Sequence, residues 1–530
     1  MQEIESKAGV DCTEENQSLA DIFIEYFECY KNNYAINVDG KSYTYRELYC
    51  LASCIAHFLD KQDSEIFAIL CDRNIYAYAA VLSAVLSGKI YLPLSSSYSE
   101  QKNLEVIEAS KVCVLIIDQT FAGVAEKLLL EQKSKFHVLL VGYESVPNWV
   151  LQHNVMTLPK KYEPFFEVQS RKKISINANL YLLFTSGSTG KPKGVMISQR
   201  QVLYYVKNII SLFSPSERDR FSQVIDLTFD LSAHDMFVCW SSGACLCVFS
   251  GNNAIDLYRY IISNKVTFWL SVPSTAILLS QARLLKDGCF PHLRCSFFCG
   301  EPLSGNIASR WLAASCNGIV ENFYGPTEAT IAFTHYSFSG GEGIVLLGKP
   351  FSGLETVLID ENLQIVEPSK VGEICLSGVQ VAAGYYNDAE LTQQRFVKLN
   401  GSDVIWYRTG DLAVLDEFNN LIFKGRIDDQ LQLRGCRIEK MELEVLLCRT
   451  LDIEELAIVP ITNAEQVVDG YLAFVVGSAL DIKEMFIRCQ KNISKFLLPA
   501  RIIKLELMPK MVNGKIDYAN LYSKSKLLCT

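Results

Sequence analysis

Short apolar runs alternate with helical segments in the first part of the chain, and this alternation limits the possible folds more than any other feature. The runs at 67–71, 91–94, 112–117 and 137–141 have the length and composition of buried strands. An uncharged segment, 74–88, lies between the first two; it is shorter than the roughly 20 residues that a membrane span needs, so it predicts a buried helix. The alternation predicts a doubly wound, mostly parallel α/β sheet, which binds ligands beyond the carboxyl ends of its strands.

The later part of the chain divides by composition into three blocks. A second alternating block covers 222–333, and strand-like runs at 355–360, 372–377, 404–407 and 421–423 then predict a small β unit. Helical spacing returns at 439–448 and 482–494. We therefore expect a large N-terminal domain over 1–425, a hinge at 426–429 and a small, mobile α+β domain over 430–530.

The composition excludes several classes of protein. The 530 residues are 49% hydrophobic and 21% charged, with a formal charge of −9, which argues against a surface that coats nucleic acid. The 18 cysteines are scattered, without a C-x-x-C pair or a secretory leader, so we expect reduced thiols, a cytoplasmic location and no zinc site. Cys245 and Cys247 alternate in an apolar run and are expected to pack on one face of a strand.

The stretch TSGSTGKPKG, at 185–194, directly follows the apolar run 181–184. Glycine lets the backbone approach an anion, hydroxyl groups donate hydrogen bonds, and lysine adds positive charge, so the composition predicts a phosphate-binding loop. The spacing differs from that of a Walker A loop. The candidate residues for binding ATP phosphates are Thr185, Ser186, Gly187, Ser188, Thr189, Gly190, Lys191 and Lys193.

This loop resembles the signature of the adenylate-forming superfamily, which includes acyl-CoA synthetases, firefly luciferase and adenylation domains of nonribosomal peptide synthetases. The string NFYGPTE at 322–328 resembles the adenine and metal motif of that superfamily. A tyrosine ring can stack on a base, and a carboxylate is a hard ligand for Mg²⁺. The resemblance implies that Glu328 binds the magnesium ion and that adenine is bound by Gly300, Glu301, Asn322, Phe323, Tyr324, Gly325 and Thr327.

Three further strings match the superfamily toward the C-terminus. Asp411, in YRTGD, is expected at a strand-ending turn, where its carboxylate would accept both ribose hydroxyls. Arg426, in GRIDDQ, would hold phosphate or ribose, and the resemblance makes Asp428 the hinge residue. Lys515, in NGKID, would be catalytic, because a positive charge offsets the repulsion between a carboxylate and the α-phosphate of ATP.

The string FDLSAHDMF at 229–237 resembles amino-acid-activating members of the superfamily. In them the first aspartate binds the substrate ammonium, and the rival interpretation is that Asp230 caps a helix beginning at Leu231. The resemblance carries the specificity positions over to Asp230, Leu231, His234, Ser271, Phe297, Cys299, Phe323, Ile331, Ala332 and Lys515. Between its charged end members this lining is neutral, so we expect a compact neutral substrate: proline first, then alanine, serine, cysteine or valine.

The resemblance implies the whole reaction. The enzyme would bind ATP, Mg²⁺ and an amino acid, form aminoacyl-AMP, and transfer the aminoacyl group to the phosphopantetheine thiol of a separate carrier protein after rotation about Asp428. Two departures from the family pattern are Gln199, where many members have histidine, and Asp235, where glutamate is usual. A Gly-Gly-x-Ser carrier site is absent, so we expect a free-standing adenylation enzyme without nucleic-acid or membrane partners. The alternatives are a D-alanine carrier-protein ligase, an acyl-CoA or aryl-acid ligase, and a catalytically silent partner.

Overall fold

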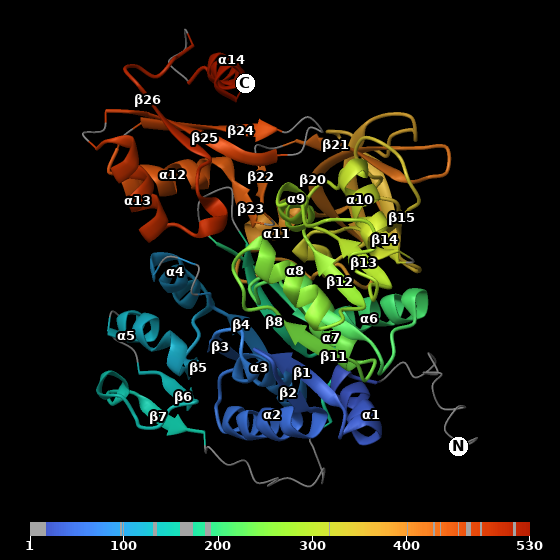
Figure 1. The fold of residues 1–530 in the computed structure, drawn as a ribbon, viewed down its shortest axis with the longest axis vertical. Helices are drawn as coiled ribbons and strands as arrows, with labels where there is room; N and C mark the ends of the chain where they lie inside the picture. Colours follow the sequence, from blue (N-terminus) through green and yellow to red (C-terminus); the bar gives the residue numbers. More distant parts are fainter. Residues whose placement is uncertain are drawn as a thin grey trace.

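The computed structural model describes residues 17–95, 98, 100–130, 135–158, 173–185, 192–316, 318–399, 401–427, 430–434, 436–453, 455–462, 468–477, 480–511 and 516–529. The fold is mixed α/β, with several sheets in a large N-terminal region and a small C-terminal region (Figure 1). The C-terminal region lies at one end of the molecule, and the first helices, α1 (Leu19–Tyr30) and α2 (Tyr45–Asp60), lie at the other.

The first sheet has seven strands and confirms the predicted parallel arrangement. Every neighbouring pair is parallel except β8 with β9, which form an antiparallel hairpin around the phosphate-loop string. Its strands, in spatial order, are β7 (Asn154–Thr157), β6 (His137–Val141), β5 (Val114–Asp118), β3 (Ile66–Leu70), β4 (Ile90–Pro93), β8 (Asn179–Thr185) and β9 (Lys193–Ser198).

The second sheet has nine strands, parallel in the centre and antiparallel at both ends. Cys245 and Cys247 lie on one of its central strands, and both side chains are buried, as expected. In spatial order the strands are β16 (Lys349–Pro350), β15 (Thr334–Phe338), β14 (Ile319–Tyr324), β13 (Cys295–Phe298), β12 (Phe268–Ser271), β10 (Arg220–Gln223), β11 (Cys245–Val248), β1 (Tyr34–Val38) and β2 (Lys41–Thr44).

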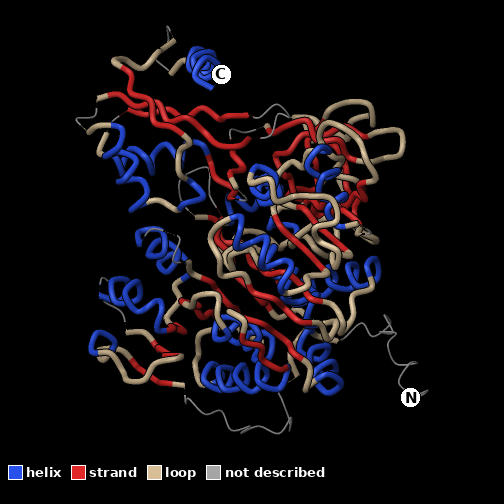
Figure 2. The backbone as a smooth tube through the Cα atoms, viewed as in Figure 1, coloured by secondary structure: helices blue, strands red, loops and turns tan. Residues whose placement is uncertain are grey.

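Helices flank both large sheets (Figure 2). The most apolar, α3 (Ile75–Ser87), is buried along nearly its whole length; Asn74 caps its first turn, and Gly88 (φ +68°) follows its last residue. No helix in the described ranges is long and apolar enough to cross a membrane. The remaining helices of this region are α4 (Glu100–Ser110), α5 (Ala122–Leu130), α6 (Gln199–Phe213), α7 (Leu231–Trp240), α8 (Ala254–Ser263), α9 (Pro273–Gln281), α10 (Gly305–Ser315) and α11 (Ala389–Arg395).

Capping explains where α2 begins. The Thr44 hydroxyl accepts a hydrogen bond from the backbone N–H of Glu47 (3.2 Å), and the Glu47 carboxylate accepts one from the backbone N–H of Thr44 (2.7 Å). This reciprocal pair satisfies two N–H groups that a helix terminus leaves open. The helix therefore begins at Tyr45, three residues before Leu48, where the amphipathic pattern over 48–59 alone predicts a start.

The predicted β unit is an antiparallel five-stranded sheet, but one prediction about it is wrong. Asp411 does not lie at a strand-ending turn, because β20 continues from Ile405 to Leu415. Gly410 adopts φ +77°, and the register shifts between Leu412 and Ala413, so the strand bulges beside Asp411 and continues. The other strands are β17 (Glu355–Ile359), β18 (Gly372–Ser377), β19 (Phe396–Lys398) and β21 (Leu421–Arg426).

The small C-terminal region has its own apolar core, in which helices pack on a three-stranded sheet. Its first strand follows the end of β21 after a short connection that includes Asp428, which lies outside the described residues. Its elements are β22 (Gln430–Leu433), β23 (Cys436–Glu439), α12 (Lys440–Leu451), β24 (Glu455–Thr462), β25 (Val468–Val476), α13 (Ile482–Asn492), β26 (Arg501–Leu505) and α14 (Tyr518–Cys529).

Candidate active site

A cavity of about 990 Å³ lies at the carboxyl ends of the parallel strands. Thr185 closes β8, Cys299 follows β13, and Tyr324 closes β14; all three line the cavity. Residues of the small region, including Gln432 and Arg434, form part of its wall. The cavity therefore lies between the two regions, where a ligand can contact both.

One wall of the cavity carries a connected set of polar side chains. The Tyr324 hydroxyl donates a hydrogen bond to Oδ2 of Asp411 (2.7 Å), and the Arg426 guanidinium pairs with Oδ1 of the same carboxylate. Arg426 also donates to the backbone carbonyl of Thr409 (3.3 Å). An aspartate held in this way faces the cavity with a fixed orientation, which is what a pair of ribose hydroxyls requires.

The other predicted adenine residues divide into two groups. Gly300, Phe323, Gly325 and Thr327 line the cavity. Glu301 also lines it, but its carboxylate accepts hydrogen bonds from the backbone N–H (2.8 Å) and hydroxyl (3.2 Å) of Ser274 at the start of α9. Asn322 does not line it; its amide donates to the carbonyls of Val345 and Leu346, so its contacts here are structural.

The predicted phosphate loop falls mostly outside the described residues: this applies to Ser186, Gly187, Ser188, Thr189, Gly190 and Lys191. Thr185 lines the cavity, and its hydroxyl is buried without a hydrogen-bond partner among the described residues, as a donor to a phosphate would be. Lys193, on β9, places its ammonium group 5.7 Å from the ring centroid of Tyr385. The described ends of the loop therefore fit an anion-binding role.

Glu328, the predicted magnesium ligand, is fully buried on the short 3₁₀ helix Thr327–Ala329. Its Oε1 accepts a hydrogen bond from the Tyr385 hydroxyl (2.8 Å). Within the described ranges no three His, Cys, Asp or Glu side chains cluster as a metal site would require. Glu328 does not itself line the cavity, although its neighbour Thr327 does. A single carboxylate fits the donor set of Mg²⁺, which is commonly held by one or two carboxylates together with substrate phosphates.

Asp230 lines the cavity and is only 7% exposed. Its Oδ2 accepts a hydrogen bond from the backbone N–H of Ile331 (3.1 Å), and its side chain makes no capping hydrogen bond to α7. The interpretation of Asp230 as a helix cap is therefore not supported. Burial raises the pKa of this carboxyl to about 7. A cationic group that reached it would restore the ionised form.

Only some of the other predicted specificity positions line the cavity. Leu231, Cys299, Phe323 and Ile331 line the cavity with Asp230. His234, Ser271, Phe297 and Ala332 are completely buried and do not line it. The His234 ring forms a hydrogen bond with the Tyr205 hydroxyl through Nδ1 (2.7 Å), and burial lowers its pKa to about 3, so the ring is neutral. The cavity therefore ends close to Asp230.

The two departures from the family pattern are both buried. The Gln199 amide donates a 3.4 Å hydrogen bond to the backbone carbonyl of Val85, so in this structure it contacts the protein interior and not the cavity. Asp235 lies one helical turn and a half beyond Asp230, and neither of its oxygens has a hydrogen-bond partner among the described residues. Burial raises the pKa of Asp235 well above its ordinary value, which favours the neutral carboxyl.

The small region presents β22 and β23 to the cavity. Gln432, Arg434 and Lys440 line it, and Arg434 also donates a hydrogen bond to the carbonyl of Lys495 (3.1 Å). Lys515 lies outside the described residues, but its neighbour Ile516 packs with the buried Leu521 and does not line the cavity. Ile516, the described residue next to Lys515, thus packs within the small region.

Two residues that shape this site, Gln380 and Tyr385, lie outside the sequence motifs. Gln380 is completely buried, and its amide donates to the carbonyls of Ala329, Thr330 and Ala332, so it holds the loop between Glu328 and Ile331. Tyr385, which binds Glu328, was also missed; its place in an aromatic pair directly after Gly384 is the one local hint. For Gln380 the sequence offers no hint, because its partners are about 50 residues away.

Comparison with known proteins agrees with the geometry. Residues 24–386 match the family described as AMP-binding enzyme. The chain belongs to this family. As an AMP-binding enzyme it is an adenylate-forming ligase, as the sequence predicted, and its relatives include amino-acid-activating enzymes.

Three relatives show how far the similarity extends. Delta-poly-L-ornithine synthetase of Acinetobacter baumannii is 27% identical over 518 residues, 95% of this chain, but the chain spans only 36% of that protein. The Vibrio cholerae adenylation domain AlmE, crystallised with glycyl-adenosine-5'-phosphate, is 29% identical; the match covers 98% of this chain and 99% of that one, with a TM-score of 0.85. NpsA-ThdA, an artificially fused adenylation–PCP di-domain from Klebsiella oxytoca, is 25% identical over 92% of this AMP-binding enzyme and 94% of that chain (TM-score 0.76).

Proposed function

We propose that this AMP-binding enzyme activates a small neutral amino acid as aminoacyl-AMP and transfers the aminoacyl group to the phosphopantetheine thiol of a separate carrier protein. The observation that carries the proposal is the position of Asp230. Its buried carboxyl faces the same cavity as Tyr324 and Asp411, and no Lys or Arg pairs with it among the described residues. An ionised carboxylate in such a place needs a cation, and a substrate ammonium supplies one.

In the first half-reaction a carboxylate oxygen of the amino acid attacks the α-phosphorus of ATP. A phosphorus–oxygen bond breaks, and pyrophosphate leaves with the bonding electron pair. Tyr324 would stack on adenine, and Asp411, fixed by Arg426, would accept the ribose hydroxyls. Glu328 would hold Mg²⁺, which neutralises charge on the phosphates when bound. Lys515 would stabilise the charge that develops between the two anions.

In the second half-reaction the carrier thiolate attacks the carbonyl carbon, the bond to phosphate breaks, and AMP leaves. The orientation of the small region supports an assignment of this structure to that step. Arg434 and Gln432 line the cavity, whereas Ile516 packs inside the small region. We infer that rotation about the 426–429 hinge, with Asp428 as the pivot, would exchange these residues for Lys515 and give the first half-reaction its catalyst.

An ATP–pyrophosphate exchange assay with each of the twenty amino acids tests the first step. Exchange should depend on a small neutral amino acid, and the panel includes proline, the first substrate expected from the sequence. Absence of exchange with every amino acid would contradict the proposal and favour a silent carrier-binding protein.

A second assay tests the acceptor. Thioester formation on a phosphopantetheine-loaded carrier domain is compared with thioester formation on coenzyme A. The proposal expects the carrier to be the better acceptor, while preference for coenzyme A would favour an acyl-CoA ligase. Separate L- and D-alanine arms of the exchange panel distinguish a D-alanine ligase.

A further inference from the structure

Four aromatic side chains fill the space beyond Asp230 where a substrate side chain would have to fit. These four, which we call the aromatic plug, are Phe213, His234, Phe297 and Phe323. The rings of Phe297 and Phe323 stack with centroids 4.8 Å apart and an angle of 23°. The His234 ring lies 5.2 Å from the Phe297 ring. These separations are contact distances for aromatic rings, so they leave no room for another group between them.

Burial shows how completely the plug closes the cavity. His234 and Phe297 are 0% exposed, and Phe323 is the only member of the plug that lines the cavity. Besides Asp230 and the polar Thr327, this part of the cavity is lined by Leu231, Cys299 and Ile331. When the ammonium group of a substrate binds Asp230, the substituent on its α-carbon therefore lies against the Phe323 ring.

Phe213 supports the plug from the end of α6, although it is not one of the ten positions that the family resemblance selects. Its ring meets Phe297 edge-on at 4.9 Å and lies 6.2 Å from Phe323. It is partly buried and packs against the main core. Because it contacts both stacked rings, it prevents them from moving away from the cavity.

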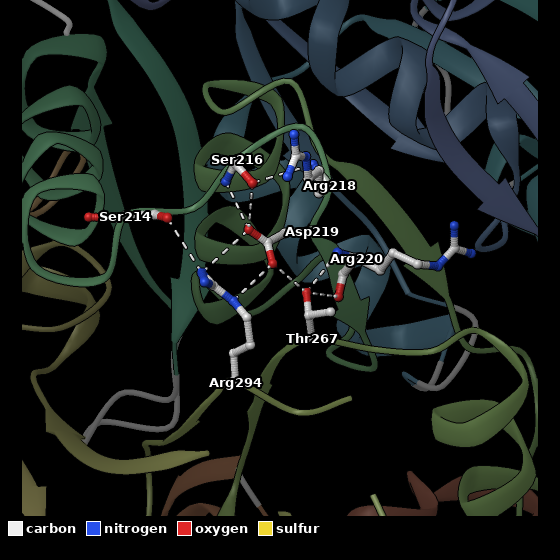
Figure 3. Close-up of polar contacts among 7 residues, drawn as sticks. All are labelled: Ser214, Ser216, Arg218, Asp219, Arg220, Thr267 and Arg294. Atoms are coloured by element: carbon white, nitrogen blue, oxygen red, sulfur yellow. Dashed lines mark hydrogen bonds and ion pairs between the residues drawn. The ribbon is translucent and has the colours of Figure 1, made fainter. Parts of the chain in front are cut away.

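A polar network fixes the end of α6 that carries Phe213 (Figure 3). The Arg294 guanidinium donates to the carbonyl of Ser214 (3.4 Å) and pairs with the buried carboxylate of Asp219 (3.2 Å). Arg294 also lies over the ring of Phe268, at 5.2 Å from its centroid, and Phe268 in turn contacts Phe297 at 6.0 Å. The rear of the plug is thus held by an ion pair as well as by ring packing.

We propose that the aromatic plug restricts the substrate to glycine, and that Phe213 is a specificity-determining residue of this enzyme. The inference rests on the proposed amino acid activation and narrows its substrate. Proline, the first expectation from the sequence, would place three ring methylenes against Phe323. In a rigid pocket, one extra methylene in the substrate lowers kcat/KM relative to the preferred substrate by about 10- to 200-fold. Alanine is therefore a poor substrate and proline a worse one.

The test compares kcat/KM for exchange with glycine, alanine, proline and valine in four enzymes: wild type, Phe213→Ala, Phe213→Leu and Phe290→Ala. Phe290 is a matched control, since it is buried against Trp311 in a different cluster, with ring centroids 5.5 Å apart. Wild type should prefer glycine over alanine by at least about tenfold. Phe213→Ala should raise the alanine-to-glycine ratio by about tenfold or more, Phe213→Leu should raise it less, and Phe290→Ala should leave it unchanged.

The outcomes separate the inference from the proposed function. If wild type exchanges with proline or valine as fast as with glycine, the aromatic plug does not restrict the substrate. The proposed amino acid activation would still stand. If both Phe213 variants still use glycine and their alanine-to-glycine ratio of kcat/KM is unchanged, Phe213 does not determine specificity. No exchange with any amino acid would instead overturn the proposed function.

Discussion

The backbone N–H of Ile331 donates a 3.1 Å hydrogen bond to Oδ2 of Asp230, across 101 residues of sequence. Ile331 can do so because it adopts φ +68°, an uncommon conformation for a β-branched residue. Gln380 holds the adjoining carbonyls, which stabilises this strained turn. The result is a carboxyl group in a fixed position at the cavity wall.

Replacing Asp230 with Asn tests its role as the ammonium partner. The amide keeps the size and can still accept from Ile331, but it carries no charge. Loss of one partner of a buried ion pair costs about 3–5 kcal/mol, so KM for the amino acid should rise by about 10²- to 5 × 10³-fold while KM for ATP changes little. Steady-state exchange kinetics measure both constants, and equal effects on the two would argue against the assignment.

The affinity for the amino acid should increase with pH in the neutral range. Burial raises the pKa of Asp230 to about 7, and only the ionised carboxylate attracts the substrate ammonium. The ionised fraction grows as pH rises, so KM should fall from about pH 6 to about pH 8. In Asp230→Asn this dependence should vanish; a KM that rises with pH in the wild type would contradict the prediction.

Lys515→Ala should separate the two half-reactions. Loss of one electrostatic contact to the transition state should slow adenylation by about 10² to 10³-fold. Transfer of the aminoacyl group from preformed aminoacyl-AMP should continue, because Lys515 is expected to act only in the first step. Lys510→Ala is a control, since Lys510 pairs with Glu455 (2.8 Å) within the small region. Equal losses in both half-reactions would show a different role for Lys515.

Tyr324→Phe should weaken ATP binding modestly. The variant keeps the ring for stacking but removes the hydroxyl that donates to Asp411. A net hydrogen bond is worth about 0.5–1.5 kcal/mol, so KM for ATP should rise by about 2- to 13-fold. Tyr258→Phe, whose ring packs on Phe290 outside the cavity, is the control. An unchanged KM for ATP would show that the hydroxyl does not orient Asp411 for ribose.

Asp219→Ala should destabilise the protein. It leaves the backbone N–H of Ser216 without its acceptor, removes the nearer of the two acceptors of the Thr267 hydroxyl, and removes the partner of Arg294 (Figure 3). Uncompensated buried polar groups cost about 1–3 kcal/mol each, so thermal unfolding should begin at lower temperature. Asp403→Ala removes a fully exposed partner of Lys398 and should not shift the transition measurably. Similar midpoints for the two variants would contradict this prediction.

Much of the local structure could be predicted because its causes are local. The runs at 137–141 and 372–377 became strands with the predicted bounds, since each is an apolar stretch that a sheet buries. The phosphate-loop string indeed follows a buried strand, β8. Element ends were less accurate: α2 begins at a capping pair, and the strand through Asp411 continues past Gly410 because a bulge absorbs the turn.

The contents of the specificity pocket were beyond local reasoning. The string FDLSAHDMF indicated an amino acid, but it could not show that His234 and Phe297 would be sealed from the cavity or that Phe213 would stand behind them. Those facts depend on how α6, α7, β13 and β14 pack. A shift of one residue in any of these elements would change which side chains reach a substrate.

By itself, the sequence determined the family, the α/β class and the order of the nucleotide motifs, because these depend on composition, spacing and the conformational preferences of neighbouring residues. Only the tertiary structure decided how deep the pocket is, which residues hold Asp230, and which face of the small region meets the cavity. These depend on contacts between residues far apart in the chain, such as Asp230 with Ile331 and Phe213 with Phe297. The free energy of such contacts exists only once the whole core has packed.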